Sequence, residues 1–171
     1  MDIFEAIEQR RSIRSYRPDE VPVDMIKSIL HAGHMAPSAG NLQGREFIIV
    51  RDSKTREKVY EHALRQPFIK EAPCCIIACA NIERSSSKYG SRGDLYAVQD
   101  ATAAVMNMML EAHNLGLGTC WVGAFNEKGI VDLFSLPYGI RPVAIMPLGY
   151  PDEQPYAPPR LNEKIEHWDG W

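Results

Sequence analysis

Residues 36–50 read Ala-Pro-Ser-Ala-Gly-Asn-Leu-Gln-Gly-Arg-Glu-Phe-Ile-Ile-Val, which is a run of small, turn-forming and amide residues followed at once by an apolar run. The first part predicts a loop at 37–45, because proline, serine, glycine and asparagine each favour turns. The second part predicts a strand at 46–50. A loop of this composition allows backbone to come close to a flat ligand and offers amide groups that can hydrogen-bond to it.

Helices are expected on both sides of this segment. Upstream, apolar residues at helical spacing predict one helix from Asp2 to about Arg11 and a second from Asp24 to about Ala36, with prolines between them. Downstream, the same reasoning predicts helices at 52–64, 95–115 and 126–133, strands at 74–80, 119–122 and 142–148, and a mobile polar loop at 83–94.

The order of these elements indicates an α+β fold. Helices and strands mix without a regular βαβ rhythm, so we expect a central, largely antiparallel sheet of four or five strands flanked by helices. A chain of 171 residues without an internal repeat or linker predicts one domain over 1–171, in which 151–171 form an extended, proline-rich C-terminal arm.

Composition narrows the class of protein. The net charge is −3, from 19 basic and 22 acidic residues, which does not indicate a nucleic-acid or anionic-membrane surface. No uncharged apolar run approaches the ~18 residues that a membrane span needs. Asp2 and Glu5 do not fit a secretory signal. We therefore expect a soluble cytoplasmic protein.

Two groups of metal-binding residue types are better explained without a metal. Cysteines 74, 75, 79 and 120 match no zinc or iron–sulfur spacing, and three of them lie in an apolar run that predicts a buried strand. His31 and His34 are one helical turn apart but have no carboxylate or cysteine at matching spacing nearby. The cysteines are expected in the core, and no metal site is predicted.

Residues 10–14, Arg-Arg-Ser-Ile-Arg, place three cations and a hydroxyl where the first helix should end. Arginine binds phosphate through a bidentate fork, so this cluster favours a compact anion. Together with the 37–45 loop it predicts a bound phosphorylated heterocycle.

These two blocks, with Gly-Leu-Gly-Thr-Cys-Trp-Val-Gly at 116–123, resemble the FMN-binding nitroreductase family in order and spacing. The resemblance spans Asp2 to about Trp168. It implies a three-layer α/β/α fold and a homodimer whose protomers interlock through long helices and exchanged terminal arms. The chain is shorter than the larger members, and it has Val122 where they carry an acidic residue.

The resemblance also implies roles for individual residues. Arg10, Ser12 and Arg160 are similar to the family's phosphate ligands, Arg11 is expected to contribute through its stem or backbone, and Arg14 resembles the basic residue that faces the pyrimidine edge and ribityl chain.

Two further segments are similar to those that meet the flavin ring. One is a loop that reaches it from the partner protomer, and the other lies along the isoalloxazine. Their residues are Pro37, Ser38, Ala39, Asn41 and Gln43 in the loop, and Trp121, Val122 and Gly123 along the ring. A plain helix-to-strand turn and a core tryptophan are the alternatives.

The function implied is that of an FMN-dependent NAD(P)H oxidoreductase, which works by ping-pong and passes hydride through flavin N5 to a nitroaromatic, a quinone or free flavin. No catalytic side chain is expected, since the flavin carries the chemistry. A dinucleotide-binding fingerprint is absent, because Gly116 and Gly118 follow a helix and lack a third glycine. The alternatives are a specialised flavin-based dehydrogenation, dehalogenation or ring fragmentation, and a flavin carrier or sensor without turnover.

Overall fold

The computed structural model describes residues 1–161 and 165–171. At its centre lies a four-stranded sheet in the order β1-β2-β4-β3, in which all neighbouring strands are antiparallel. The strands are β1 (Arg45–Val50), β2 (Cys74–Asn81), β3 (Gly118–Thr119) and β4 (Ile140–Gly149). The predicted α+β fold with a largely antiparallel sheet is confirmed.

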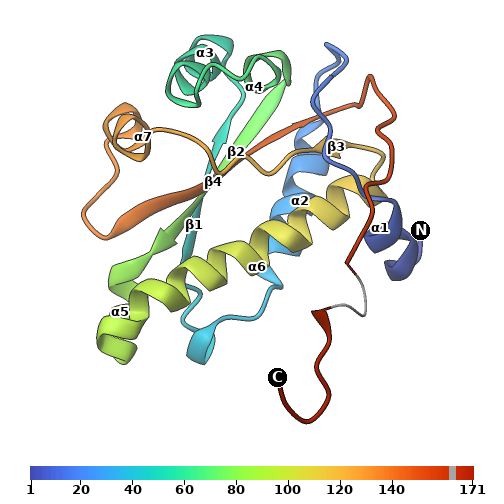
Figure 1. Ribbon diagram of the computed structural model, residues 1–171. Coiled ribbons are helices and arrows are strands. Elements are labelled where there is room, and N and C mark those ends of the chain that lie inside the picture. The colour runs from blue at the N-terminus through green and yellow to red at the C-terminus, as the bar shows by residue number, and fades with distance from the viewer. Residues whose placement is uncertain (162–164) are drawn as a thin grey trace.

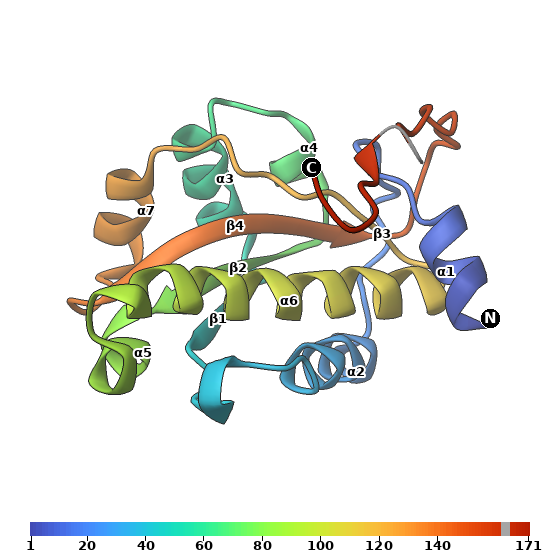
Figure 2. The same cartoon turned by 60° about the horizontal axis from the view of Figure 1, so that its bottom comes forward.

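Helices cover both faces of the sheet and make three layers, as Figures 1 and 2 show. One face packs against α3 (Ser53–His62), α4 (Phe68–Glu71) and α7 (Glu127–Phe134). The other face packs against α2 (Val23–His34) and the long α6 (Gly93–Asn114). The remaining helices are α1 (Ile3–Gln9), α5 (Ile82–Tyr89) and the short 3-10 turns η1 (Ala39–Asn41) and η2 (Gly90–Arg92).

Strand β2 explains why the core is apolar on both sides of the sheet. Successive side chains of a strand point to opposite faces. Cys75, Ile77 and Cys79 therefore enter the core beneath α3 and α7, whereas Cys74 and Ile76 enter the core beneath α2 and α6. All four cysteines of the chain are buried and free, as their predicted place in the core requires.

Several predicted helix starts are confirmed by their capping bonds. Asp2 accepts a hydrogen bond from the Glu5 N–H at 3.0 Å, Asp52 from the Thr55 N–H at 2.8 Å, and Asn126 from the Gly129 N–H at 3.0 Å. Among the bounds that differ from the prediction are one in each of the first two helices. Helix α2 begins at Val23, after Pro22, so Asp24 lies in its first turn rather than at its cap, and α1 ends at Gln9 rather than near Arg11.

The prediction of a mobile polar loop at 83–94 is wrong. This segment forms α5 and η2 and runs directly into α6. The side chain of Asn81 caps α5 by accepting from the Arg84 N–H at 2.9 Å, and Ser85 is fully buried. The polar composition reflects a short amphipathic helix whose outer side faces solvent, which composition alone does not distinguish from a loop.

Two smaller differences concern short elements. The strand predicted at 119–122 is reduced to Gly118–Thr119, after which only Val122 pairs again, with Ile145. The one-turn helix α4 was not predicted, since four residues are too few to show a helical period.

The C-terminal arm runs without helix or strand from Pro151 to residue 161, beside the end of α1 in both views (Figures 1 and 2). Its first residues are joined to the segment after α1, because Tyr16 pairs with Pro151 and the Asp152 N–H donates to the Ser15 carbonyl at 2.9 Å. Among the described residues, no helix is both long and apolar enough to cross a membrane.

Candidate functional site

A cavity of about 290 Å³ lies between the end of α1 and the C-terminal arm. Its lining includes four arginine side chains and a hydroxyl, which we call the arginine cradle. The cradle consists of Arg10, Arg11, Ser12, Arg14, Pro155, Tyr156, Pro158 and Arg160. The structure therefore brings together the three residues predicted as phosphate ligands, Arg10, Ser12 and Arg160, with Arg11 and with Arg14, which was predicted to face the ring edge.

The segment 12–17 is held in place from two sides, which explains the position of the cradle. On one side, the Ile13 N–H donates to the Thr119 carbonyl of β3 at 2.9 Å. On the other side, the Glu153 carboxylate accepts from the backbone N–H of Arg14 and, at 3.1 Å, from that of Ser15. These contacts lock the arm against the residues that follow α1, so that Arg160 reaches Arg10.

The electrostatics of the cradle fit an anion. Burial lowers the pKa of Arg10, and the neighbouring charges of Arg160 and Arg11 lower it further. The Nη1 atom of Arg10 is buried and has no hydrogen-bond partner among the described residues. A buried donor without a partner costs about 1–3 kcal/mol, and a phosphate oxygen would both satisfy it and offset the repulsion between the cations. The residues present therefore fit the phosphate of FMN.

The 37–43 segment lies elsewhere. In Figures 1 and 2 the light-blue turn that contains η1 lies near α5 and the start of α6, away from α1 and the arm. The Asn41 and Gln43 side chains are exposed, and φ is +56° at Asn41 and +52° at Gln43. One protomer does not bring this loop to its own arginine cradle, which agrees with the expectation that the loop serves the partner's site.

The third predicted segment begins beside the cradle. Ser12 pairs with Thr119, the residue before Cys120, so the chain leads from the cradle to Trp121 and onward. Val122 is buried, and its N–H donates to the Ile145 carbonyl at 3.0 Å. That N–H is therefore not available to a flavin, and the exposed Gly123 offers the backbone N–H of this segment that a ring could meet.

Within the described residues, no group of three or more histidine, cysteine or acidic side chains is placed to hold a metal ion. His31 and His34 both lie exposed on α2.

Sequence reasoning missed several residues of this region. Tyr156 lines the cradle and Glu153 ties the arm to it, but neither stands out in a polar, proline-rich stretch. Asp100, which holds the 37–43 loop, is an acid on an otherwise apolar stripe of α6, and that position was the available signal.

Comparison with known proteins gives the same fold and family. The sequence profile of the Nitroreductase family matches residues 7–67 and 61–150. A protein of Methanothermobacter thermautotrophicus with the provisional name NADH dehydrogenase/NAD(P)H nitroreductase is 39% identical, over 98% of this chain and 88% of its own length. An FMN reductase [NAD(P)H] of Bacillus subtilis is 29% identical, over 97% of this chain and 73% of its own.

Among solved structures, the NADPH:FMN oxidoreductase of Vibrio harveyi complexed with NAD+ superposes with a TM-score of 0.91 at 25% identity, over 98% of this chain and 77% of its own. The α+β fold of this chain is thus that of a flavoenzyme class. The chain belongs to the nitroreductase family.

Proposed function

We propose that this protein is an FMN-dependent NAD(P)H oxidoreductase. The observation that carries the proposal is the arginine cradle, a cavity lined by cations from both ends of the chain, one of which, Arg10, has a buried nitrogen without a partner among the described residues. Relatives named as an FMN reductase and as an NAD(P)H nitroreductase support it.

Bound FMN would supply the redox chemistry, since its N5 accepts a hydride from the nicotinamide and passes it to an acceptor. The chain's own residues bind and orient. Arg10, Ser12 and Arg160 hold the phosphate, and Arg14 places a positive charge toward the ring edge that becomes anionic on reduction. Gly123 offers its N–H to the ring. Ping-pong transfer to nitroaromatics, quinones or free flavin requires no acid–base side chain, because the flavin carries the hydride.

The complete site needs two protomers. The loop 37–43 and the arginine cradle lie in different parts of the folded protomer, and both are expected to meet one flavin, so we propose a homodimer with two shared sites. NAD(P)H is a metabolite of the cytoplasm, and we place the enzyme there.

The test begins with the flavin content of the purified protein. We expect a yellow protein that releases FMN rather than FAD and that oxidises NADH or NADPH when menadione is added. Binding without turnover would favour a flavin carrier or sensor instead. A colourless protein that also fails to bind added FMN would contradict the whole proposal.

A further inference from the structure

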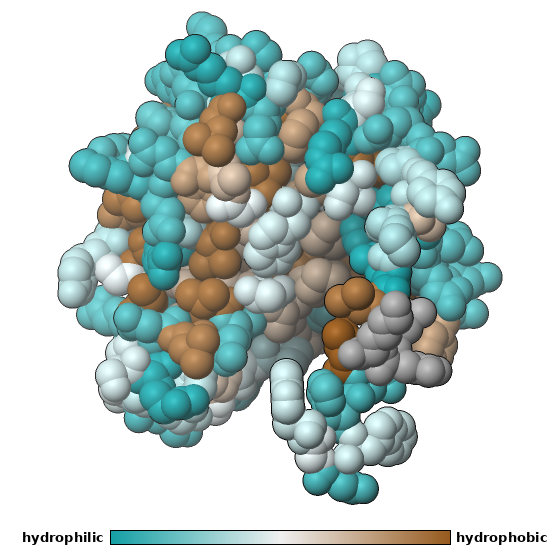
Figure 3. Space-filling view, viewed as in Figure 1, coloured by the Kyte–Doolittle hydropathy of each residue, from teal (hydrophilic) through white to brown (hydrophobic). Residues whose placement is uncertain are grey.

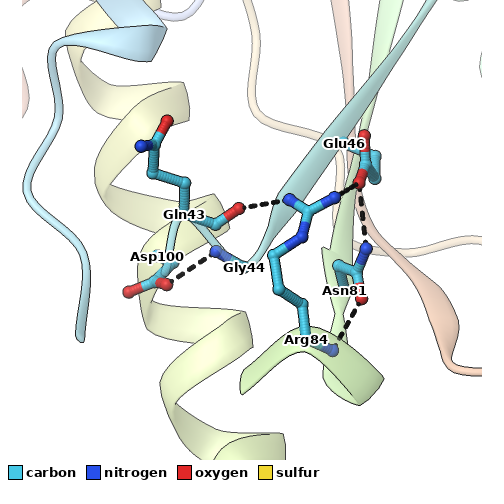
Figure 4. Close-up of polar contacts among 6 residues, drawn as sticks. All are labelled: Gln43, Gly44, Glu46, Asn81, Arg84 and Asp100. Carbon is cyan, nitrogen blue, oxygen red and sulfur yellow. Dashed lines mark hydrogen bonds and ion pairs between the residues drawn. The ribbon is translucent and has the colours of Figure 1, made fainter. Parts of the chain in front are cut away.

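The two ends of the 39–44 segment are held by one buried carboxylate. Asp100, in α6, is only 4% exposed. Its Oδ1 accepts from the Ala39 N–H at 2.9 Å and its Oδ2 from the Gly44 N–H at 3.0 Å. Figure 4 shows Asp100 on α6 with its dashed contact to Gly44. One side chain thus spans the loop that is expected to meet the flavin.

This loop has three residues in the left-handed region of the backbone. Gly40, Asn41 and Gln43 all have φ between +52° and +56°. The left-handed region costs an ordinary residue about 1–2 kcal/mol. Such conformations persist where surrounding contacts over-determine them, and they cluster at functional sites.

A second contact fixes the outer side of the same loop. The Nη1 atom of Arg84 donates to the Gln43 carbonyl at 2.7 Å, and its other end pairs with the Glu46 carboxylate. Asn81 donates to the same carboxylate at 2.9 Å and also caps the helix that carries Arg84. Figure 4 shows this arrangement, in which Arg84 reaches from α5 across to the loop and to β1.

Arg45 extends the network toward the start of the loop. It is 4% exposed and its Nη2 donates to the carbonyls of His34 at 2.8 Å and Ala36 at 3.1 Å. Burial lowers the pKa of Arg45, and the charge of Asp100 acts in the opposite direction. The carboxylate therefore serves both the loop and a buried cation beside it.

The backbone donors of the loop are mostly used to hold its own shape. The Gln43 N–H donates to the Ser38 hydroxyl at 3.0 Å, and those of Ala39 and Gly44 are taken by Asp100. The side-chain amides of Asn41 and Gln43 are exposed, and the described part of the chain offers them no hydrogen-bond partner. They are the groups left to meet a ligand.

We propose that Asp100 and Arg84 are positioning residues, which hold the 37–44 loop in the shape that presents Asn41 and Gln43 to the flavin ring of the partner's site. The inference rests on the proposed function. Both residues act through the loop rather than by touching the cofactor, and they act on the ring rather than on the phosphate. Loss of either residue should therefore weaken the binding of FMN and of riboflavin by the same factor.

The test compares dissociation constants of FMN and riboflavin, measured by flavin fluorescence on the flavin-stripped full chain. Asp100→Asn keeps the size of the side chain but replaces one carboxylate oxygen by an NH2 group. This group is a donor and cannot accept from the backbone N–H that it meets. We expect both flavins to bind about 10- to 100-fold more weakly, because hydrogen bonds to charged groups contribute about 1.5–3 kcal/mol. Amide hydrogen exchange of residues 39–44 should be faster in the flavin-free variant.

Two controls separate positioning from general stability. Asp94→Asn removes an exposed carboxylate from the same helix and should leave both constants unchanged. Ile130→Ala destabilises the opposite core, where this side chain is fully buried, and should lower the melting temperature without changing flavin affinity. If Ile130→Ala loses as much flavin as Asp100→Asn, the effect is one of stability and the inference is overturned.

Arg84→Gln keeps the inference testable if Asp100→Asn does not fold. Arg84 is on the surface, and its loss should weaken both flavins about 2- to 10-fold, since a hydrogen bond contributes about 0.5–1.5 kcal/mol. The matched control is Arg141→Gln, which breaks a comparable ion pair with Glu127 away from the loop. Equal affinities in the two arginine variants would overturn the inference.

The remaining outcomes are distinguishable from failure of the proposed function. A parent that binds no flavin refutes the proposed function, and this inference with it. If the parent binds FMN, and Asp100→Asn binds both flavins as tightly as the parent does, the inference alone is refuted. Weaker binding of FMN with unchanged riboflavin would also refute it, because it would place the effect at the phosphate.

Discussion

Arg10 and Arg160 come from opposite ends of the chain and line the same small cavity, where the charge of Arg160 helps to lower the pKa of Arg10. Two cations held together in this way repel each other. A dianionic phosphate between them turns that repulsion into attraction.

The first prediction concerns this pair. Arg160→Ala should weaken FMN binding about 10- to 100-fold, because one charge-assisted hydrogen bond contributes about 1.5–3 kcal/mol and each tenfold step is about 1.4 kcal/mol. Titration of the flavin-stripped protein gives the dissociation constant. Riboflavin has no phosphate and should bind the variant and the parent equally. Parallel loss of both flavins would mean that Arg160 supports the fold instead of binding the phosphate.

The second prediction concerns the potential of the bound flavin. Arg14 is exposed at the mouth of the cradle, and we expect it to stabilise the reduced, anionic ring. Arg14→Ala should lower the two-electron potential by about 20–40 mV, equivalent to about 1–2 kcal/mol of lost charge interaction. Dye equilibration of the fully loaded variant measures it, with Arg17→Ala as the control. An unchanged potential would place Arg14 away from the ring.

The third prediction concerns assembly. Helix α1 exposes Ile3, Phe4 and Ile7 at 66%, 73% and 54%. These side chains were expected on one face of the first helix, and an exposed apolar group of this kind marks an interface. Figure 3 shows further hydrophobic residues on the face that α6 crosses. We therefore expect a dimer in sedimentation velocity, and a shift to monomer with loss of flavin in Phe4→Asp.

The matched control for assembly is Tyr138→Asp, which places the same charge at another exposed aromatic residue. It should remain a dimer with bound flavin. A flavin-loaded monomer of the parent would refute the shared site.

The fourth prediction follows from the cysteines. Burial raises the pKa of Cys74 to about 11 and that of Cys79 to about 12, and it raises those of Cys75 and Cys120 as well. At pH 8 the folded protein should therefore not react with a thiol reagent, whereas the unfolded chain should react at all four cysteines.

The same shifts make stability depend on pH. In the unfolded chain the thiols ionise near pH 8.5, so above this pH the unfolded state binds fewer protons than the folded state. The stability that the protonated thiols contribute is complete below about pH 8.5 and is lost as pH rises toward the folded pKa values. Denaturant midpoints measured at pH 7, 9 and 10 should fall in that order, and a constant midpoint would contradict the burial.

Local features of the chain were predictable where the interactions that produce them lie within one short segment. The helices predicted to start at Asp52 and Asn126 are capped by these two side chains in the structure, and such a cap needs only the next three residues. The prediction for the polar segment 83–94 was wrong, because its helix α5 packs against α6. Composition does not contain that contact.

The sequence by itself determined that 10–14 is a dense cationic cluster, that 36–43 is a loop leading into a strand, and that 74–80 is a strand buried on both faces. Each of these follows from the type and spacing of neighbouring residues. Tertiary structure alone decided that Arg160 joins Arg10, that the Val122 N–H belongs to Ile145, and that Asp100 holds Ala39 and Gly44. These contacts join residues far apart along the chain, and their free energy exists only once the sheet and α6 have brought the partners together.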